Sequence, residues 1–201
     1  MIFKKYILLG LLWCLLGACI HDSHQEGKAL ERDTIKLPAK IYQKSNFTNK
    51  APYTFEYPIY AKISDDDIAG QSYWNNLDFP DFSARLHLTY YEFKNPKQIM
   101  GLTEEARKLA MKHTIRASSI RPEKIEFVER HVFGLYYFIE GDAASSVQFF
   151  LTDSVQHYFR GALYFNNAAN YDSIKPIIKF LDKDIRHLVN TFEWKPKANL
   201  P

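Results

Sequence analysis

The side chains of this sequence that could do chemistry are its histidines and a short polar segment rich in Asp and Ser. Five of the seven histidines fall in five different predicted elements: His87, His113, His131, His157 and His187. Neither His-x-x-x-His nor Cys-x-x-Cys occurs, and these are spacings that bind metals. No Gly-x-Ser-x-Gly turn and no glycine-rich phosphate loop occurs either. The spacing therefore predicts no catalytic residue and no metal site.

The densest polar segment runs from Glu140 to Gln148. Small residues within it allow the backbone to pass close to another surface. We expect a partner or ligand surface here, made by Glu140, Asp142, Ser145, Ser146 and Gln148, with Asp153, His157 and Arg160 facing the same rim across the following hairpin. The alternative is a plain strand connection whose polar side chains satisfy buried amides.

Two further hypotheses stay open. A hydrolase would use Ser145 or Ser146 with a base such as His113, and such a serine needs that base within about 3 Å. A glycan-binding protein would use exposed aromatic rings, for which Tyr73-Trp74 and Trp194 are the candidates.

The amino terminus predicts a cleaved signal peptide over residues 1–18. Two lysines precede an apolar run from Tyr6 to Leu16, which is shorter than the roughly 20 residues of a membrane-spanning helix. Leu16-Gly17-Ala18-Cys19 resembles the bacterial lipobox, whose thiol accepts a diacylglyceryl group. Cys19 is therefore the predicted lipidation site, and its diacylglycerol and N-acyl chain are the only attached groups expected. The alternative is that Cys19 is an ordinary apolar residue at the end of a signal peptide that is cleaved at another position.

The charge balance and the cysteine count limit the partners and the bonds that the protein can use. Lys and Arg total 26 against 23 Asp and Glu, and two of the lysines would leave with the leader. This near balance speaks against a nucleic-acid partner, because phosphate contacts need an excess of basic residues. Cys14 would also leave with the leader, so the mature chain has one Cys and no disulfide. The fold must then depend on its hydrophobic core.

The mature chain divides into three predicted parts. Residues 19–50 are polar and irregular and form a lipid-anchored tether. About 30 residues have a contour length near 100 Å, so the folded part could stand clear of the lipid. Residues 51–196 form a single globular domain, and residues 197–201 are a tail.

Alternating and helical patterns predict the elements of this domain. The expected strands are Tyr53–Tyr57, Phe82–Phe93, Ile125–Phe133, Leu135–Glu140, Ser146–Leu151, Tyr158–Phe165 and Thr191–Trp194. One helix would begin at Asn95-Pro96, with a second cap at Thr103, and fade near Ala117, and a long helix would be capped by Ser173. This order predicts an α+β fold, an antiparallel sheet flanked by helices, and it resembles the Mog1/PsbP-type sandwich.

Several phrases of the sequence together indicate a family. They are Pro52–Pro58, Asp78–Pro80, Ala84–Leu88, Lys112–Thr114, Ala143–Ser154, Phe159–Asn166 and Thr191–Trp194. Across about residues 50–195 the chain resembles the gliding motility lipoprotein D (GldD) family of the Bacteroidota. This resemblance implies a non-catalytic envelope lipoprotein required for gliding and linked to type IX secretion. Its partners would be other envelope proteins of that machinery.

The residues after Cys19 bear on location. Ile20 is not the Asp that retains enterobacterial lipoproteins in the inner membrane, and His21–His24 is not a strongly acidic export signal. We expect a periplasm-facing protein anchored to a membrane of the envelope, and we leave inner and outer membrane open. The alternative function is a periplasmic ligand-binding lipoprotein or hydrolase that uses the Glu140–Gln148 turn.

Overall fold

The computed structural model describes residues 36–47, 51–65, 73–95, 97–166 and 170–196. The predicted leader, Cys19, most of the predicted tether and the predicted tail lie outside these residues. Residues from Leu37 onward form one compact unit.

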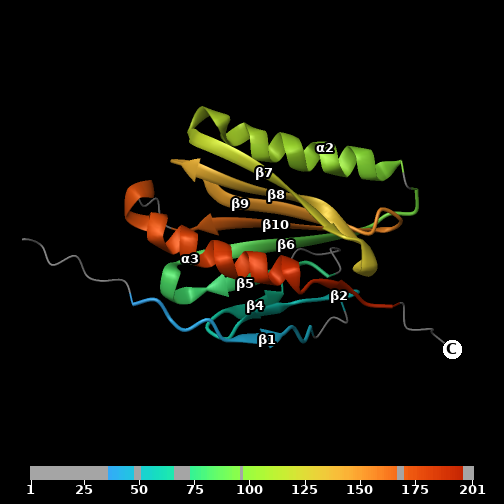
Figure 1. Cartoon of the computed structure of the whole chain (residues 1–201), viewed down its shortest axis with the longest axis horizontal. Coiled ribbons are helices and arrows are strands. Elements are labelled where there is room, and N and C mark those ends of the chain that lie inside the picture. Colours follow the sequence, from blue (N-terminus) through green and yellow to red (C-terminus); the bar gives the residue numbers. More distant parts are fainter. Residues whose placement is uncertain (1–35, 48–50, 66–72, 96, 167–169, 197–201) are drawn as a thin grey trace, which may run out of the picture. The chain divides into compact units, whose positions relative to one another are not determined.

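A seven-stranded antiparallel sheet forms the centre of this unit (Figure 1). Across the sheet the strands are β4 (Lys62–Asp65), β5 (Asn75–Phe79), β6 (Ala84–Glu92), β10 (His157–Phe165), β9 (Ser145–Thr152), β8 (Val132–Gly141) and β7 (Ala117–Phe127). Two smaller sheets pair β1 (Tyr42–Lys44) with β3 (Glu56–Pro58), and β2 (Tyr53–Thr54) with β11 (Glu193–Trp194). The predicted hairpin at Thr152-Asp153-Ser154 is confirmed, because it joins β9 to β10.

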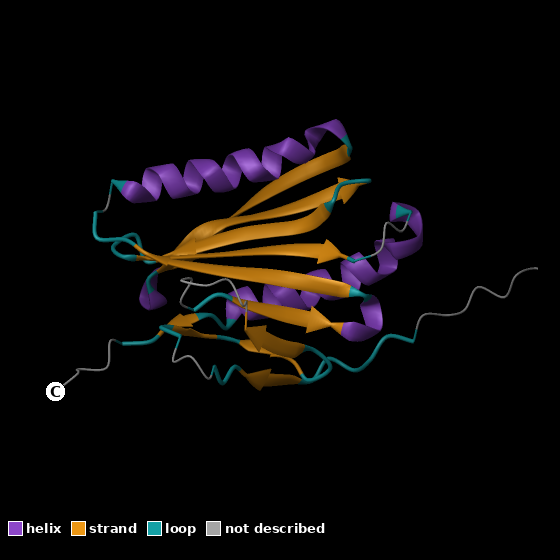
Figure 2. Ribbon diagram, turned by 180° about the vertical axis from the view of Figure 1, so that it is seen from behind, coloured by secondary structure: helices purple, strands orange, loops and turns teal. Residues whose placement is uncertain are grey.

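Helices α2 (Gln98–Met111) and α3 (Tyr171–Asn190) cover opposite faces of the sheet (Figures 1 and 2). Successive side chains of a strand point to opposite faces. Phe149 and Phe159 accordingly belong to the large core that includes α3, while Phe150 and Tyr158 pack beneath α2. The predicted α+β class, an antiparallel sheet flanked by helices, is confirmed.

The α3 side holds the main core, and it is strongly aromatic. The Phe159 ring lies 4.6 Å from Tyr53 and 5.0 Å from Phe192, between ring centroids. Gly161 lies opposite Phe149 in the sheet, and a Cβ there would sit 2.3 Å from the Phe149 ring. Only glycine lets that ring lie across the strand at this point.

The predicted long helix is confirmed as α3, which buries Ile178, Leu181, Ile185, Leu188 and Val189 at helical spacing. The predicted cap is wrong. Asn170 caps the helix by accepting the backbone N–H of Asp172, so the helix begins before Ser173. Asn caps helices as well as Ser does, which is why the choice of Ser173 failed.

The predicted first helix also begins and ends elsewhere. The Asn95 side chain accepts the N–H of Lys97 in a turn before the helix, which starts at Gln98. No break occurs at Thr103, whose hydroxyl donates to the Met100 carbonyl within the helix. The helix ends at Met111 and is followed by a 3-10 turn, Lys112–Ile115.

Two strand predictions were wrong. Tyr53–Tyr57 is two strands, because β2 and β3 pair with different partners on either side of the buried Phe55. Ile125–Phe133 spans a chain reversal: β7 ends at Phe127, and a 3-10 turn over Val128–Arg130 leads into β8. Strands β4, β5 and most of β7 were not predicted. Strand β7 carries charged residues and Pro122, both of which are compatible with an edge strand.

The predicted boundary of the tether at residue 50 is also wrong. Residues 42–44 form β1, while Ser45 and Phe47 are buried. The fold therefore includes residues well before Ala51, and Phe47 among them packs into the core on the α3 side.

Candidate functional site

The Glu140–Gln148 segment forms the end of β8, a turn and the start of β9. Gly141 has a φ of +100°, and a Cβ there would lie 2.5 Å from the Ser118 nitrogen. The expectation that small residues here allow a close approach of another backbone is confirmed, and that backbone belongs to the start of β7. Within the turn itself, Asp142–Ala144, the side chains of Asp142 and Ala144 are exposed to solvent.

Three polar side chains meet beneath the end of α2. The Gln148 Oε1 atom accepts a hydrogen bond from Arg160 Nη2 at 2.9 Å, and its amide nitrogen lies 2.9 Å from His113 Nε2. Gln148 is buried, and both partners are half-buried. Burial, and then the charge of Arg160, lower the pKa of His113. A neutral His113 therefore suits this cluster best.

The structure thus brings together only part of the predicted set. Arg160 does share a face with Gln148, but His157 faces the opposite side of the sheet, because the two positions differ by an odd number. The His157 ring stacks on Trp194 at 5.1 Å between centroids, and its Nδ1 lies 2.6 Å from the Tyr90 hydroxyl. The prediction that His157 and Arg160 share a rim was wrong.

Asp153 lies at the far end of the β9–β10 hairpin from the Asp142 turn. Its carboxylate accepts the backbone N–H groups of Val155, Gln156 and His157 at 2.8–2.9 Å. Asp153 therefore shapes its own turn and does not belong to the surface around Gln148.

The two serines are interior residues. Ser145 is fully buried and its hydroxyl donates to the Val147 carbonyl, while Ser146 is buried as well. His113, the base of the hydrolase hypothesis, is bonded to an amide instead. These contacts give the hydrolase hypothesis no support.

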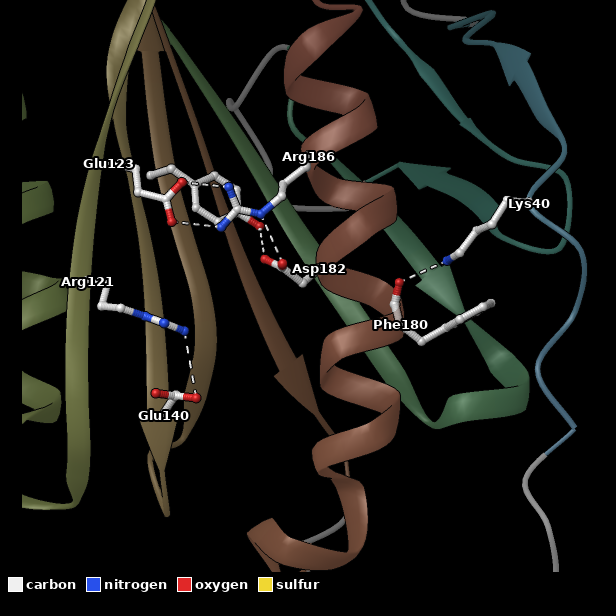
Figure 3. Close-up of polar contacts among 8 residues, drawn as sticks. Lys40, Arg121, Glu123, Glu140, Phe180, Asp182 and Arg186 are labelled. Carbon is white, nitrogen blue, oxygen red and sulfur yellow. Dashed lines mark hydrogen bonds and ion pairs between the residues drawn. The ribbon is translucent and has the colours of Figure 1, made fainter.

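Glu140 lies on the α3 face of the sheet and pairs with Arg121 of the edge strand at 3.7 Å (Figure 3). Asp142 pairs with Arg116 at 3.6 Å, and both side chains are largely exposed. Exposed pairs of this kind contribute little to stability. They leave opposite charges at the surface, where another molecule can reach them.

An open groove of about 1020 Å³ lies against the turn. Its described lining includes the turn residues Asp142–Ala144, Arg116, the end of β10 over Tyr164–Asn166, and the start of α3 over Asn170–Asp172. The sequence prediction found the turn and missed the rest. Asn170 could have been found as a helix cap, whereas Arg116 precedes a strand whose exposed pattern gave no alternation.

A second polar cluster joins α3 to the edge strand. Arg186 makes two hydrogen bonds to Glu123 on β7, at 2.6 and 2.9 Å, and a third to Asp182 at 2.9 Å (Figure 3). Its guanidinium carbon lies 4.4 Å from the centroid of the buried Tyr136 ring. Because both acids pair with Arg186, this cluster holds β7 against α3 and offers little unpaired charge to a ligand.

The rings proposed for glycan binding pack against the core instead of standing free. The Trp74 indole N–H donates to the Tyr90 carbonyl, and that of Trp194 to the His131 carbonyl. Tyr73, Trp74 and Trp194 all contact the main core and are half-buried. No open aromatic platform is formed by these three rings.

Within the described ranges, no group of three or more His, Cys, Asp or Glu side chains is arranged to hold a metal ion. Neither of the described helices is long and apolar enough to cross a membrane.

Comparison with known protein families identifies the family of this chain. A family model described as gliding motility lipoprotein GldD matches residues 23–194. The chain belongs to the GldD family. The resemblance carried by the sequence motifs is therefore confirmed, and the match takes in the turn, the groove and helices α2 and α3 of this GldD-family chain.

No curated protein matches this GldD-family chain in sequence. Among solved structures, it is similar to the solution structure of cyanobacterial PsbP (CyanoP) from Synechocystis sp. PCC 6803, at 13% identity and a TM-score of 0.45. That similarity covers 90% of this chain and 99% of that chain.

Proposed function

We propose that this chain is a lipid-anchored accessory protein of the cell envelope that supports gliding motility and the associated type IX secretion machinery by binding other envelope proteins. It does so without catalysing a reaction. The observation that carries the proposal is membership of the GldD family, whose name describes a gliding motility lipoprotein. The lipid is carried by Cys19, and the folded part faces the periplasm.

The Asp142 groove is the proposed partner surface. It combines an exposed pair of opposite charges, Arg116 and Asp142, with the half-buried ring of Tyr164. Polar rims with some apolar area are typical of protein interfaces. The buried Gln148 cluster beneath α2 supports the neighbouring strands rather than contacting the partner itself.

Deletion of the gene in a gliding host tests the cellular role. Spreading should be lost and secreted cargo should accumulate inside the cell. A deletion strain that spreads and exports normally would contradict the role. Intact mass of the native product tests the anchor: the expected species starts at Cys19 and carries acyl chains.

Site-specific photocrosslinking tests the surface. A photoreactive residue at Asp142 should capture an envelope protein in living cells. The same residue at Val155, exposed at the opposite end of the β9–β10 hairpin, is the matched control and should capture none. Equal capture at both positions, or capture at Val155 alone, would reject the groove as the partner surface.

A ligand-binding role is the second candidate, because the groove has room for a small molecule. A volume of about 1020 Å³ exceeds what a small molecule needs, but the groove is open rather than enclosed. Small-molecule sites bury most of their ligand. A co-purifying small molecule identified by native mass spectrometry, and lost on blocking the groove at Ala144 with Trp, would favour this role over partner binding.

A further inference from the structure

The first described segment is extended and has two different sides. Pro38, Lys40 and Tyr42 are half-buried, while Leu37, Ala39 and Ile41 alternate with them and are exposed. A period of two is typical of an extended chain with one face packed on the protein. Apart from Pro38, the inward side is polar or aromatic, and the outward side is aliphatic, which is the reverse of a usual surface segment.

The inward side is held firmly on α3. Lys40 Nζ donates to Asp184 at 2.6 Å. It also donates to the Phe180 carbonyl at 2.8 Å, the contact drawn in Figure 3. Tyr42 donates to the same carboxylate at 3.0 Å and stacks on His187, and Tyr60 donates to it too. Asp184 is only 1% exposed, so these partners compensate the burial of its charge. Burial and the Asp184 bond raise the pKa of Tyr42 to about 12, which keeps its hydroxyl a donor.

The outward side forms an apolar patch, which we define as Leu37, Ile41 and Ile59. Their side chains are 45%, 54% and 52% exposed. Ile59 lies beside Ile41, because its N–H donates to the Ile41 carbonyl at 2.9 Å. Single exposed aliphatic residues are ordinary, but adjacent ones on a segment held rigidly from behind are not.

Basic side chains of α3 lie beside the segment that carries this patch. Lys183 is exposed and acts on Lys40 as a neighbouring like charge. Lys179 is also exposed, one helical turn before it on α3. The carboxylate that this segment contacts, Asp184, is buried and paired with Lys40. Aliphatic side chains beside lysines are the combination that binds an anionic lipid surface.

We propose that the apolar patch rests on the anionic lipid surface to which the chain is anchored. This rests on the proposed lipidation of Cys19, which lies eighteen residues before Leu37. A chain of that length spans at most about 65 Å, so the bilayer is always within reach of the patch. Three side chains are far too few for a stable protein interface, which needs about 20–30 residues a side. They suffice for a surface already held near by an anchor, because tethering raises the local concentration.

Docking in this way also orients the domain. In both overall views β1 and α2 lie at opposite ends of the unit (Figures 1 and 2). A patch placed on the lipid next to β1 therefore directs α2 away from the membrane. The lipid chain alone would leave the domain free to rotate, whereas the docked patch fixes its orientation with α2 away from the membrane.

Depth-dependent fluorescence tests the proposal on the native, acylated protein in vesicles of phosphatidylethanolamine and phosphatidylglycerol. With Cys19 acylated and Cys14 lost with the leader, a single introduced thiol can be labelled selectively. An environment-sensitive dye at I41C or, separately, I59C should shift to the blue and be quenched by spin-labelled lipid. The same dye at I115C or M100C, exposed on the α2 side at 92% and 74%, should remain in water and is the matched control.

Two measurements on the same sample separate the possible failures. Intact mass reports whether Cys19 is acylated, so an unacylated product would contradict the proposed anchor rather than the docking. Acylated protein whose labels at residues 41 and 59 stay in water would overturn the docking. Labels that stay in water on vesicles but become shielded in whole envelopes would also overturn it, because a protein partner would then cover the patch. Unfolding curves matching those of the unlabelled protein confirm that each variant folds.

Discussion

The face of the sheet beneath α3 and the face beneath α2 are built from different kinds of side chain. Beneath α3, one continuous core gathers aromatic rings from four separate parts of the chain, including Tyr53, Phe159 and Phe192. Beneath α2, two small clusters of buried residues flank the polar contacts of Gln148. The difference indicates that apolar burial is concentrated on the α3 side, whereas the α2 side combines a smaller apolar core with the polar cluster around Gln148.

Truncating one ring on each face should give the largest effects and the sharpest test of this difference. Phe159→Ala should lower the free energy of unfolding by about 4–5 kcal/mol, since it leaves a cavity among several rings. Phe150→Ala, beneath α2, should cost about 3 kcal/mol because its cluster is smaller and can relax. Urea unfolding of both variants measures the difference. Equal losses, or a larger one for Phe150, would refute the contrast.

The buried carboxylate of Asp184, on the α3 side, should come next. Asp184→Ala removes the common acceptor of Lys40, Tyr42 and Tyr60, and it should cost about 3 kcal/mol. Asp142→Ala is the control, because that exposed carboxylate should contribute less than about 1 kcal/mol. Thermal unfolding compares them, and a loss below 1 kcal/mol for Asp184→Ala would mean that the segment over residues 37–42 is not held by this contact.

On the α2 side, Gln148→Ala should cost about 2 kcal/mol. It leaves the half-buried Arg160 and His113 without their shared amide partner. Gln148→Glu is the informative comparison, since it keeps an acceptor for Arg160 but loses the amide N–H. Chemical unfolding should rank the wild type above Gln148→Glu and Gln148→Ala last; a neutral Gln148→Ala would show that the polar contacts do not stabilise this face.

His113 should make the α2 side sensitive to acid. Its pKa is lowered in the fold, so the unfolded chain takes up the proton first as the pH falls. The stabilisation is complete above about pH 6.5 and is lost progressively below it. His113→Gln should therefore flatten the fall in unfolding free energy between about pH 7 and 5.5, measured by urea titration at each pH. An unchanged slope would assign the acid sensitivity to other groups.

The smallest effect on stability should come from the groove. Arg116→Ala breaks an exposed pair and should change the free energy of unfolding by less than about 0.5 kcal/mol. The same substitution should nevertheless reduce photocrosslinking from Asp142 to its envelope partner. Full crosslinking in this variant would exclude Arg116 from the proposed surface.

The secondary structure with strong internal patterning could be predicted from the sequence. The alternation around Leu86 and Leu88 placed β6, and the stripe from Ile178 to Val189 placed α3, because a buried face imposes its period on the residues that form it. Edge strand β7 could not be found in this way. It is mostly exposed, so burial imposes no period on its side chains.

Only part of the candidate site was predictable from the sequence. The sequence located the turn at Asp142 by its composition, and it named Gln148 and Arg160. It missed that His157 faces the other side of the sheet, because the predicted strand began at Tyr158 whereas β10 begins at His157, an odd number of positions from Arg160.

By itself, the sequence determined the α+β class and the GldD family, and it predicts a lipobox at Cys19, because each depends on local order along the chain. Only the tertiary structure decided that Lys40 reaches Asp184, across 144 residues of sequence, and so turned part of a presumed tether into part of the fold. Contacts of that range depend on how distant segments pack, and no local pattern of residue types records them.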